Sequence, residues 1–139
     1  MNRVLDLARK VNPFPNPPVG ALIVKDGKII GEGYHKKAGE PHAEINAFQD
    51  AGNRGNGKLV KGATLYCTLE PCFHVGRTPP CVDEVIRQGI AIVVISVRDP
   101  NPLTNGKSIE KLKKKGIEVV EGVLEKEGKK LIRRFANQF

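Results

Sequence analysis

Short apolar, β-branched runs alternate along the chain with segments whose apolar positions recur every three or four residues. Such runs are typical of buried strands, and such recurrence is typical of amphipathic helices. We expect strands at 21–25, 28–34, 63–69, 90–97 and 117–120. We expect helices at 4–9, 42–50, 82–88 and 109–115, and a basic surface helix around 126–134.

The order of these elements predicts the fold. Asp26-Gly27 joins the first two strands, and this dipeptide favours a type I′ hairpin because both turn residues need a positive φ. The later strands alternate with helices, which indicates parallel strands with right-handed crossovers. We therefore expect an α/β protein, a three-layer α/β/α sandwich around a mixed five-stranded sheet with an N-terminal antiparallel hairpin and parallel later strands.

Length and hydropathy set the class of protein. A chain of 139 residues corresponds to about one domain and can bury a core without disulfides, so we expect a single domain over 1–139. No stretch approaches the roughly 20 apolar residues that a membrane span requires. We therefore expect a soluble, cytoplasmic protein with no membrane partner.

The net charge of +8 raises the question of a polyanionic partner. Much of this charge lies at 111–115 and 126–134, where lysines and arginines are interleaved with apolar residues. Aromatic residues that could stack on bases are scarce there, so solvated helix faces are favoured over nucleic-acid binding. Some of these cations are available to a phosphorylated substrate.

Candidate chemistry lies in two short segments, His42-Ala43-Glu44 and the stretch from Pro71-Cys72 to Cys81. A histidine, a glutamate two residues later, a Pro-Cys and a second cysteine are the residue set of a zinc-dependent base deaminase. Three protein ligands leave zinc one open position, where the pKa of a bound water falls to about 7. We expect His42, Cys72 and Cys81 to be the ligands of zinc and Glu44 to be the group that moves protons.

Each residue also has a simpler explanation. His42, taken singly, could be a surface histidine, and Glu44 could be an acid in the first turn of a helix. The two cysteines could be buried thiols, or could belong to a structural zinc site whose fourth ligand would be Cys67 or His74. We interpret Cys67 as a core thiol because it lies within a predicted strand. The combination of motifs favours the catalytic site.

The spacing of the two cysteines, with eight residues between them, is wider than the usual Pro-Cys-x-x-Cys. The expanded segment resembles the riboflavin-biosynthesis pyrimidine deaminases, which have a cytidine deaminase-like fold. The resemblance extends through four further motifs, which read NPPVGA at 16–21, GEGYH at 31–35, HAE at 42–44 and DPNP at 99–102.

The resemblance implies zinc-dependent hydrolytic deamination of diaminohydroxyphosphoribosylaminopyrimidine. It implies that the residues that contact the heterocycle, ribose and phosphate are Asn16, His35, His74, Arg77, Thr78, Asp99 and Asn101. The location of Asp99 just past a strand that ends at 97 is independent support, since open α/β sheets bind ligands at strand carboxyl ends. Turn chemistry alone is an equally good explanation for Asn101. The family often has glycine where Ser108 stands.

Two rival functions are open at this stage. One is a deaminase of a tRNA base or of free cytidine or deoxycytidylate, and the other is a non-catalytic, zinc-stabilised binding module. Many bacterial members of the family continue into a reductase domain after a segment like 131–139. The chain is therefore expected to be either a stand-alone deaminase, with a separate reductase as a candidate partner, or a piece of such a fusion. The formation of a homo-oligomer is also left open.

Overall fold

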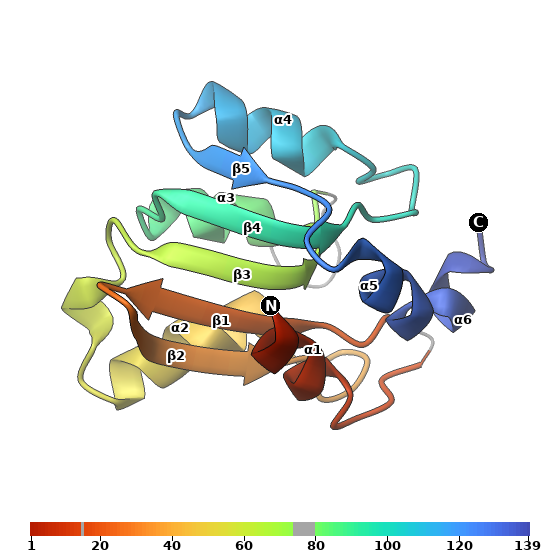
Figure 1. The fold of residues 1–139 in the computed structure, drawn as a ribbon, viewed down its shortest axis with the longest axis horizontal. Coiled ribbons are helices and arrows are strands. Elements are labelled where there is room, and N and C mark those ends of the chain that lie inside the picture. The colour runs from red at the N-terminus through yellow and green to blue at the C-terminus, as the bar shows by residue number, and fades with distance from the viewer. Residues whose placement is uncertain (15, 74–79) are drawn as a thin grey trace.

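A mixed five-stranded sheet forms the centre of the molecule, with strand order β2-β1-β3-β4-β5 (Figure 1). The structure is a computed structural model that describes residues 1–14, 16–73 and 80–139. The strands are β1 (Gly20–Lys25), β2 (Lys28–Tyr34), β3 (Thr64–Leu69), β4 (Ile92–Val97) and β5 (Glu118–Val120). β1 runs antiparallel to β2 and β3, whereas β3, β4 and β5 are parallel. The predicted mixed sheet is therefore confirmed.

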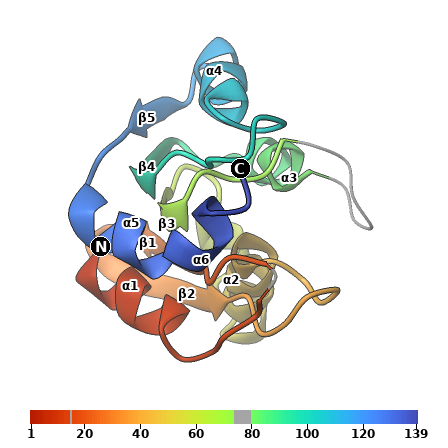
Figure 2. The ribbon, with the colours of Figure 1, turned by 90° about the vertical axis from the view of Figure 1, so that its right-hand side faces the viewer.

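Helices cover both faces of this sheet. They are α1 (Asn2–Ala8), α2 (Ala43–Asn53), α3 (Cys81–Arg87), α4 (Lys107–Lys114), α5 (Glu125–Leu131) and α6 (Arg133–Ala136), with a 3₁₀ turn at Gly57–Leu59. Figure 2 shows α2 and α3 on one face and α1 and α5 on the other. The three-layer sandwich is as predicted. α6 lies beyond the carboxyl ends of β3 and β4 (Figure 1).

The hairpin and the helix boundaries test the local predictions. Asp26 and Gly27 have φ values of 50° and 76°, which confirms the type I′ turn. The prediction that α2 begins at His42 was wrong by one residue, because His42 is the N-cap, with extended φ and ψ of −71° and 166°. The His42 side chain therefore extends from the residue just before the first turn of α2.

The core lies mainly between the sheet and the helices α2 and α3. Ile23, Leu65 and Ile95 of the three central strands are fully buried there. Cys67 of β3 is also fully buried in this cluster, which confirms its assignment as a core thiol, and burial raises the pKa of this thiol well above its usual value. In the described part of the chain, no helix has both the length and the apolar character that a membrane span needs.

Close contact between β2 and α2 holds the N-terminal end of α2 in place. A Cβ atom at Gly33 would lie 2.5 Å from the backbone nitrogen of Ala47, and closer still to the carbonyl oxygen of Ala43. Because both atoms belong to the helix backbone, the helix would have to move. Only glycine lets α2 approach the sheet this closely.

We expect Gly33→Ala to lower the free energy of unfolding by about 3 kcal/mol, because the added methyl group overpacks a backbone contact. Urea unfolding followed by circular dichroism measures this change. Gly52→Ala is the matched control in α2, since a Cβ there has nothing within 4 Å. It should raise the free energy of unfolding by up to about 1 kcal/mol. Equal effects of the two substitutions would contradict the close packing of β2 on α2.

Candidate active site

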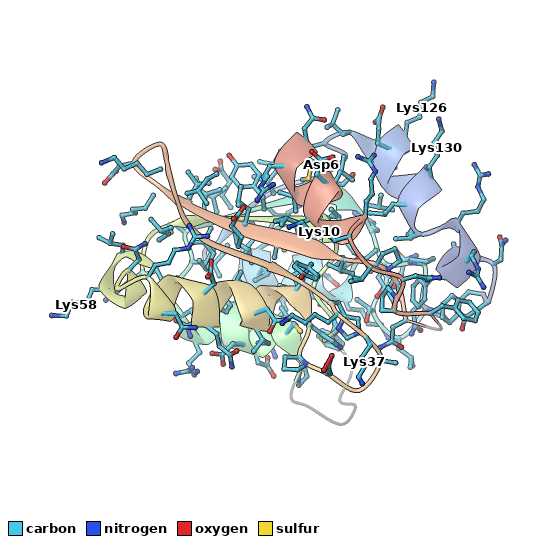
Figure 3. The ribbon with its side chains drawn as sticks, turned by 90° about the horizontal axis from the view of Figure 1, so that it is seen from below. Asp6, Lys10, Lys37, Lys58, Lys126 and Lys130 are labelled. Atoms are coloured by element: carbon cyan, nitrogen blue, oxygen red, sulfur yellow. The ribbon has the colours of Figure 1, made fainter. Side chains whose placement is uncertain are left out.

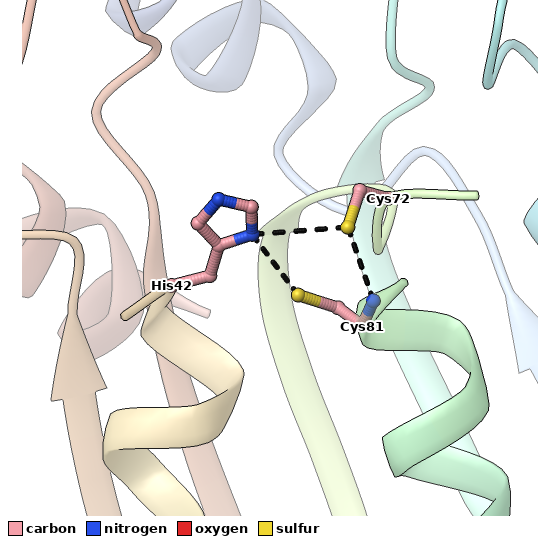
Figure 4. A group of neighbouring side chains, drawn as sticks. All are labelled: His42, Cys72 and Cys81. Atoms are coloured by element: carbon pink, nitrogen blue, oxygen red, sulfur yellow. Dashed lines mark hydrogen bonds between the residues drawn. The ribbon is translucent and has the colours of Figure 1, made fainter. Parts of the chain in front are cut away.

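Three side chains from separate parts of the chain point toward one another (Figure 4). His42 is the N-cap of α2, Cys72 lies in the loop after β3, and Cys81 is the first residue of α3. His42 Nδ1 lies 3.0 Å from Cys81 Sγ and 3.7 Å from Cys72 Sγ. The Cys81 backbone N–H donates a hydrogen bond to Cys72 Sγ at 3.0 Å. Two helix N-termini and one strand end thus converge on a single point.

This donor set suits zinc. Within residues 1–14, 16–73 and 80–139, these three residues form the group able to hold a metal ion, with all ligand atoms within 4.8 Å of one another. One imidazole nitrogen and two sulfurs are ligands that zinc favours, and three protein ligands leave a fourth position for water or substrate. Cys67, considered as a candidate fourth ligand of a structural site and interpreted as a core thiol, is not part of the group.

The electrostatics of the site favour a thiolate. The Cys81 side chain, which donates a hydrogen bond to Cys72, is the main reason that the pKa of Cys72 falls to about 4, and His42 adds to the effect. The hydrogen bond to Cys72 also raises the pKa of His42. The Cys81 thiol has a pKa well above its usual value, mainly because it donates a hydrogen bond to Cys72 and also because it is buried. A divalent cation reverses this last effect, since it stabilises both thiolates.

Glu44 lies in the first turn of α2, two residues after His42. It is only 3% exposed, so Glu44 is a buried acid and not a solvated one. Burial is the main cause that raises the pKa of the Glu44 carboxyl. A carboxyl with a raised pKa accepts and returns a proton more easily near neutral pH, which is the property that a general acid and base needs.

A cavity of about 290 Å³ opens beside these residues. It is bounded by residues from six parts of the chain: Asn16, Pro17, Val19, His35, His42, Glu44, Leu69, Glu70, Cys72, Asp99, Asn101, Phe135, Gln138 and Phe139. The cavity lies at the carboxyl ends of β3 and β4, where open α/β sheets bind ligands. Four of the predicted substrate-binding residues line it together with Glu44 and two of the three zinc ligands.

Asn16 and His35 form a hydrogen-bonded pair in this cavity. His35 Nδ1 lies 3.1 Å from the carbonyl oxygen of Pro41, and His35 Nε2 lies 3.1 Å from Asn16 Nδ2. Since a carbonyl oxygen only accepts, Nδ1 carries the proton and Nε2 accepts from the Asn16 amide. Burial lowers the pKa of His35, which agrees with a neutral ring. Asn16 is thus held in one orientation, with a second N–H and an oxygen left for other partners.

Asp99 and Asn101 line the cavity from the loop after β4. Asp99 Oδ1 accepts from the Asn101 backbone N–H at 2.9 Å, and Asn101 Oδ1 accepts from the Leu103 N–H at 3.0 Å. Both side chains therefore make the turn contacts typical of Asp and Asn. Asn101 therefore makes the expected turn contact, and the same turn brings Asn101 to the cavity.

Three other predicted contacts, His74, Arg77 and Thr78, lie outside the described residues. Sequence reasoning in turn missed two parts of the cavity wall. Glu70 is 2% exposed and precedes the Pro-Cys pair. The aromatic side chains of Phe135 and Phe139 come from α6 and the residues after it, where short, mostly polar sequence gives little signal of contact with a distant site.

The comparisons with known proteins decide the family. The family model described as the cytidine and deoxycytidylate deaminase zinc-binding region matches residues 1–97, which include all three proposed ligands and Glu44. A diaminohydroxyphosphoribosylamino-pyrimidine deaminase from Buchnera aphidicola is 49% identical over 137 residues, which cover 97% of this chain and 90% of that protein. The chain belongs to the riboflavin-biosynthesis deaminase family.

Longer relatives show the same deaminase fold. The riboflavin biosynthesis protein RibD of Aquifex aeolicus is 56% identical over 133 residues, which are 94% of this chain and 36% of that protein. The crystal structure of a Thermotoga maritima deaminase/reductase superposes with a TM-score of 0.91 at 53% identity, over 97% of this chain and 38% of that one. The predicted cytidine deaminase-like fold is confirmed. The chain spans little more than a third of the length of these two relatives.

Ser108, in the described part of this deaminase domain, has a buried hydroxyl group without a hydrogen-bond partner. Among the described residues, Ser108 Oγ makes no hydrogen bond and its residue is fully buried, in the first turn of α4. We expect Ser108→Ala to raise the free energy of unfolding by up to about 1 kcal/mol, because it removes an unsatisfied hydroxyl and keeps a good helix former. Thermal unfolding measures the effect. A loss larger than about 1 kcal/mol would mean that the hydroxyl has a stabilising partner.

Proposed function

We propose that this deaminase domain hydrolyses the amino group of diaminohydroxyphosphoribosylaminopyrimidine, a step of riboflavin biosynthesis. The observation that carries the proposal is the shared cavity. Glu44, His42 and Cys72 line the same space as the four described substrate-binding candidates. The carboxylate expected to move protons and two of the three expected zinc ligands thus border the same space as the groups expected to bind a heterocycle and a sugar.

The reaction exchanges an amino group for an oxygen. Zinc, when bound, lowers the pKa of a water molecule to about 7 and so supplies hydroxide at neutral pH. Glu44 would take one proton from the water and give it to the ring nitrogen, and would then take the proton of the newly formed hydroxyl group and give it to the departing amine. The water oxygen forms a bond to the amino-bearing carbon, the carbon–nitrogen bond breaks, and ammonia leaves. Asn16 and His35 line the same cavity, which supports their expected contacts with the heterocycle and the ribose.

The distribution of basic residues supports a small substrate over a nucleic acid. Figure 3 labels Lys10, Lys37 and Lys58, which lie at separate places, and Lys126 and Lys130, which lie close together on α5. A groove that follows a polynucleotide backbone needs such charges in one stripe. The labelled lysines instead occupy several parts of the surface, which fits solvated positions. The cytoplasmic location, a homo-oligomer and a separate reductase partner stay predictions from the sequence.

The test is ammonia release by the zinc-loaded domain. We expect turnover of the phosphoribosylaminopyrimidine and, at equal concentrations, at least about a hundredfold lower kcat/KM for cytidine and deoxycytidylate. A coupled glutamate dehydrogenase assay measures the ammonia. Faster turnover of cytidine or deoxycytidylate would overturn the proposed substrate. Absence of ammonia from every compound, with zinc present at one per chain, would overturn the proposed reaction.

A further inference from the structure

Glu70 is a buried carboxylate that accepts four backbone hydrogen bonds. Its Oε1 accepts from the N–H of Asp99 at 3.2 Å and of Gly106 at 3.0 Å. Its Oε2 accepts from the N–H of Ser108 at 3.1 Å and of Ile109 at 3.3 Å. All four donors belong to the loop after β4 and the start of α4, some 30 to 40 residues further along the chain. Glu70 therefore holds this segment through tertiary hydrogen bonds, and we call this set of four hydrogen bonds the clamp.

The start of α4 depends on this clamp. Gly106 is the N-cap of α4, has a left-handed φ of 76°, and provides no side-chain cap. The first N–H groups of a helix have no partner within the helix. A carboxylate from another element satisfies them and also interacts favourably with the positive end of the helix. Without it, several buried donors would lose their acceptor.

The same carboxylate connects the two halves of the proposed active site. Glu70 lines the cavity together with Asp99 and Asn101. Its own N–H donates to the carbonyl oxygen of Val97 at the end of β4, at 2.9 Å. Two residues after Glu70, Cys72 joins the proposed zinc site. Glu70 thus bridges the loop that supplies a metal ligand and the loop that supplies Asp99 and Asn101.

The geometry of the Glu70 carboxylate fits a role in supporting the loop after β4, and not a role in proton transfer. Both carboxylate oxygens are engaged by backbone donors, whereas a catalytic acid or base needs an oxygen directed at the reacting atoms. A carboxylate in this setting acts through the loop that it holds. Loops that carry binding groups have to be positioned by a rigid scaffold.

We propose that Glu70 is a positioning residue that sets Asp99 and Asn101 against the sugar end of the substrate. This inference rests on the proposed function, because it assigns the cavity side of that loop to substrate binding. It predicts that loss of the clamp weakens substrate binding and leaves the metal site and the chemical step nearly intact.

The first experiment compares Glu70→Gln with the unchanged domain. The glutamine keeps the size of the side chain but turns one oxygen into an N–H₂ group, which faces backbone donors and cannot accept from them. We expect KM for the phosphoribosylaminopyrimidine to rise about tenfold, kcat to change less than about threefold, and zinc to stay at one per chain. A fall in kcat with an unchanged KM would overturn the proposal, as would loss of zinc.

Two further variants test whether a rise in KM comes only from a general loss of folding. Glu70→Asp keeps the charge on a shorter side chain, so we expect a smaller rise in KM, about threefold. Glu110→Gln, an exposed change in the first turn of α4, is the control and should leave KM unchanged. If Glu70→Gln does not fold, an unchanged KM in a folded Glu70→Asp protein overturns the proposal.

A double-mutant cycle tests whether Glu70 acts through Asp99. If it does, Glu70→Gln should raise KM much less in an Asp99→Ala background than in the unchanged domain. Fully additive effects would mean that Glu70 influences binding by another route, and would overturn the assignment.

Hydrogen exchange separates this inference from the proposed function. The amides of Asp99, Gly106, Ser108 and Ile109 should exchange faster in Glu70→Gln, whereas amides in β1 and β3 should not. This readout requires no substrate. If the unchanged domain releases no ammonia, the proposed function fails and exchange still tests the clamp. Unchanged exchange at the four amides would show that the clamp itself is wrong.

Discussion

Glu44→Gln should leave a folded, zinc-loaded protein that releases ammonia about a thousandfold more slowly than the unchanged domain. Glutamine has nearly the same shape as glutamate but cannot take up and return a proton, and general acid–base catalysis of this kind contributes about 10²- to 10⁴-fold. Burial at 3% exposure means that bulk water replaces the lost group poorly. Steady-state ammonia release, with metal analysis of the same sample, measures the effect.

An exposed glutamate provides the control for this substitution. Glu127→Gln in α5 makes the same chemical change on the surface, and we expect kcat to stay within about twofold. The Glu44 result also separates the enzyme from a non-catalytic binding module. Nearly full activity of Glu44→Gln would contradict its role in proton transfer, whereas an inactive and zinc-free protein would mean that Glu44 supports the metal site.

The parts of this structure that sequence predicted well depend on local chemistry. Asp26-Gly27 needs only its own backbone to form a type I′ turn. Apolar runs mark the strands because a buried strand must be apolar on both faces. The pairing of His42 with the cysteines was predictable for another reason, since zinc accepts few residue types and each motif carries one or two of them. The turn and the strands were thus predictable from local sequence pattern, and the metal site from the residue types that zinc binds.

The parts that sequence did not predict depend on contacts between distant segments. Glu70 looks like a charge at the end of a strand until the start of α4 lies next to it. Phe135 lies in a helix of only four residues, too short for hydrophobic periodicity to show which way it faces. The one-residue error at His42 has another origin, because the cap and the first turn differ in φ and ψ and not in residue preference alone. Tertiary packing decides the first two features, and backbone conformation decides the third.

Removal of a proposed zinc ligand should abolish both metal binding and activity. Cys72→Ala takes away one of three ligands, and zinc held by the remaining two should fall from one per chain to nearly none after dialysis against a mild chelator. Ammonia release should become undetectable. The protein should also lose the stability that bound zinc contributes, about 4 kcal/mol when free zinc exceeds its dissociation constant a thousandfold. Metal analysis and thermal unfolding with and without zinc measure these effects.

Cys67→Ala is the matched control, because it removes a thiol five residues earlier in the chain that is fully buried in the core. This change creates a small cavity and should cost about 1 kcal/mol of stability, yet leave zinc at one per chain and zinc-dependent stabilisation intact. The comparison distinguishes general destabilisation from loss of a ligand, since both variants lose a thiol and only one of them faces His42. Stoichiometric zinc in Cys72→Ala, or zinc loss in Cys67→Ala, would contradict the ligand set and reopen Cys67 as a structural ligand. Because the fourth position on zinc is where water must bind, the identity of the three ligands decides whether this site can support hydrolysis at all.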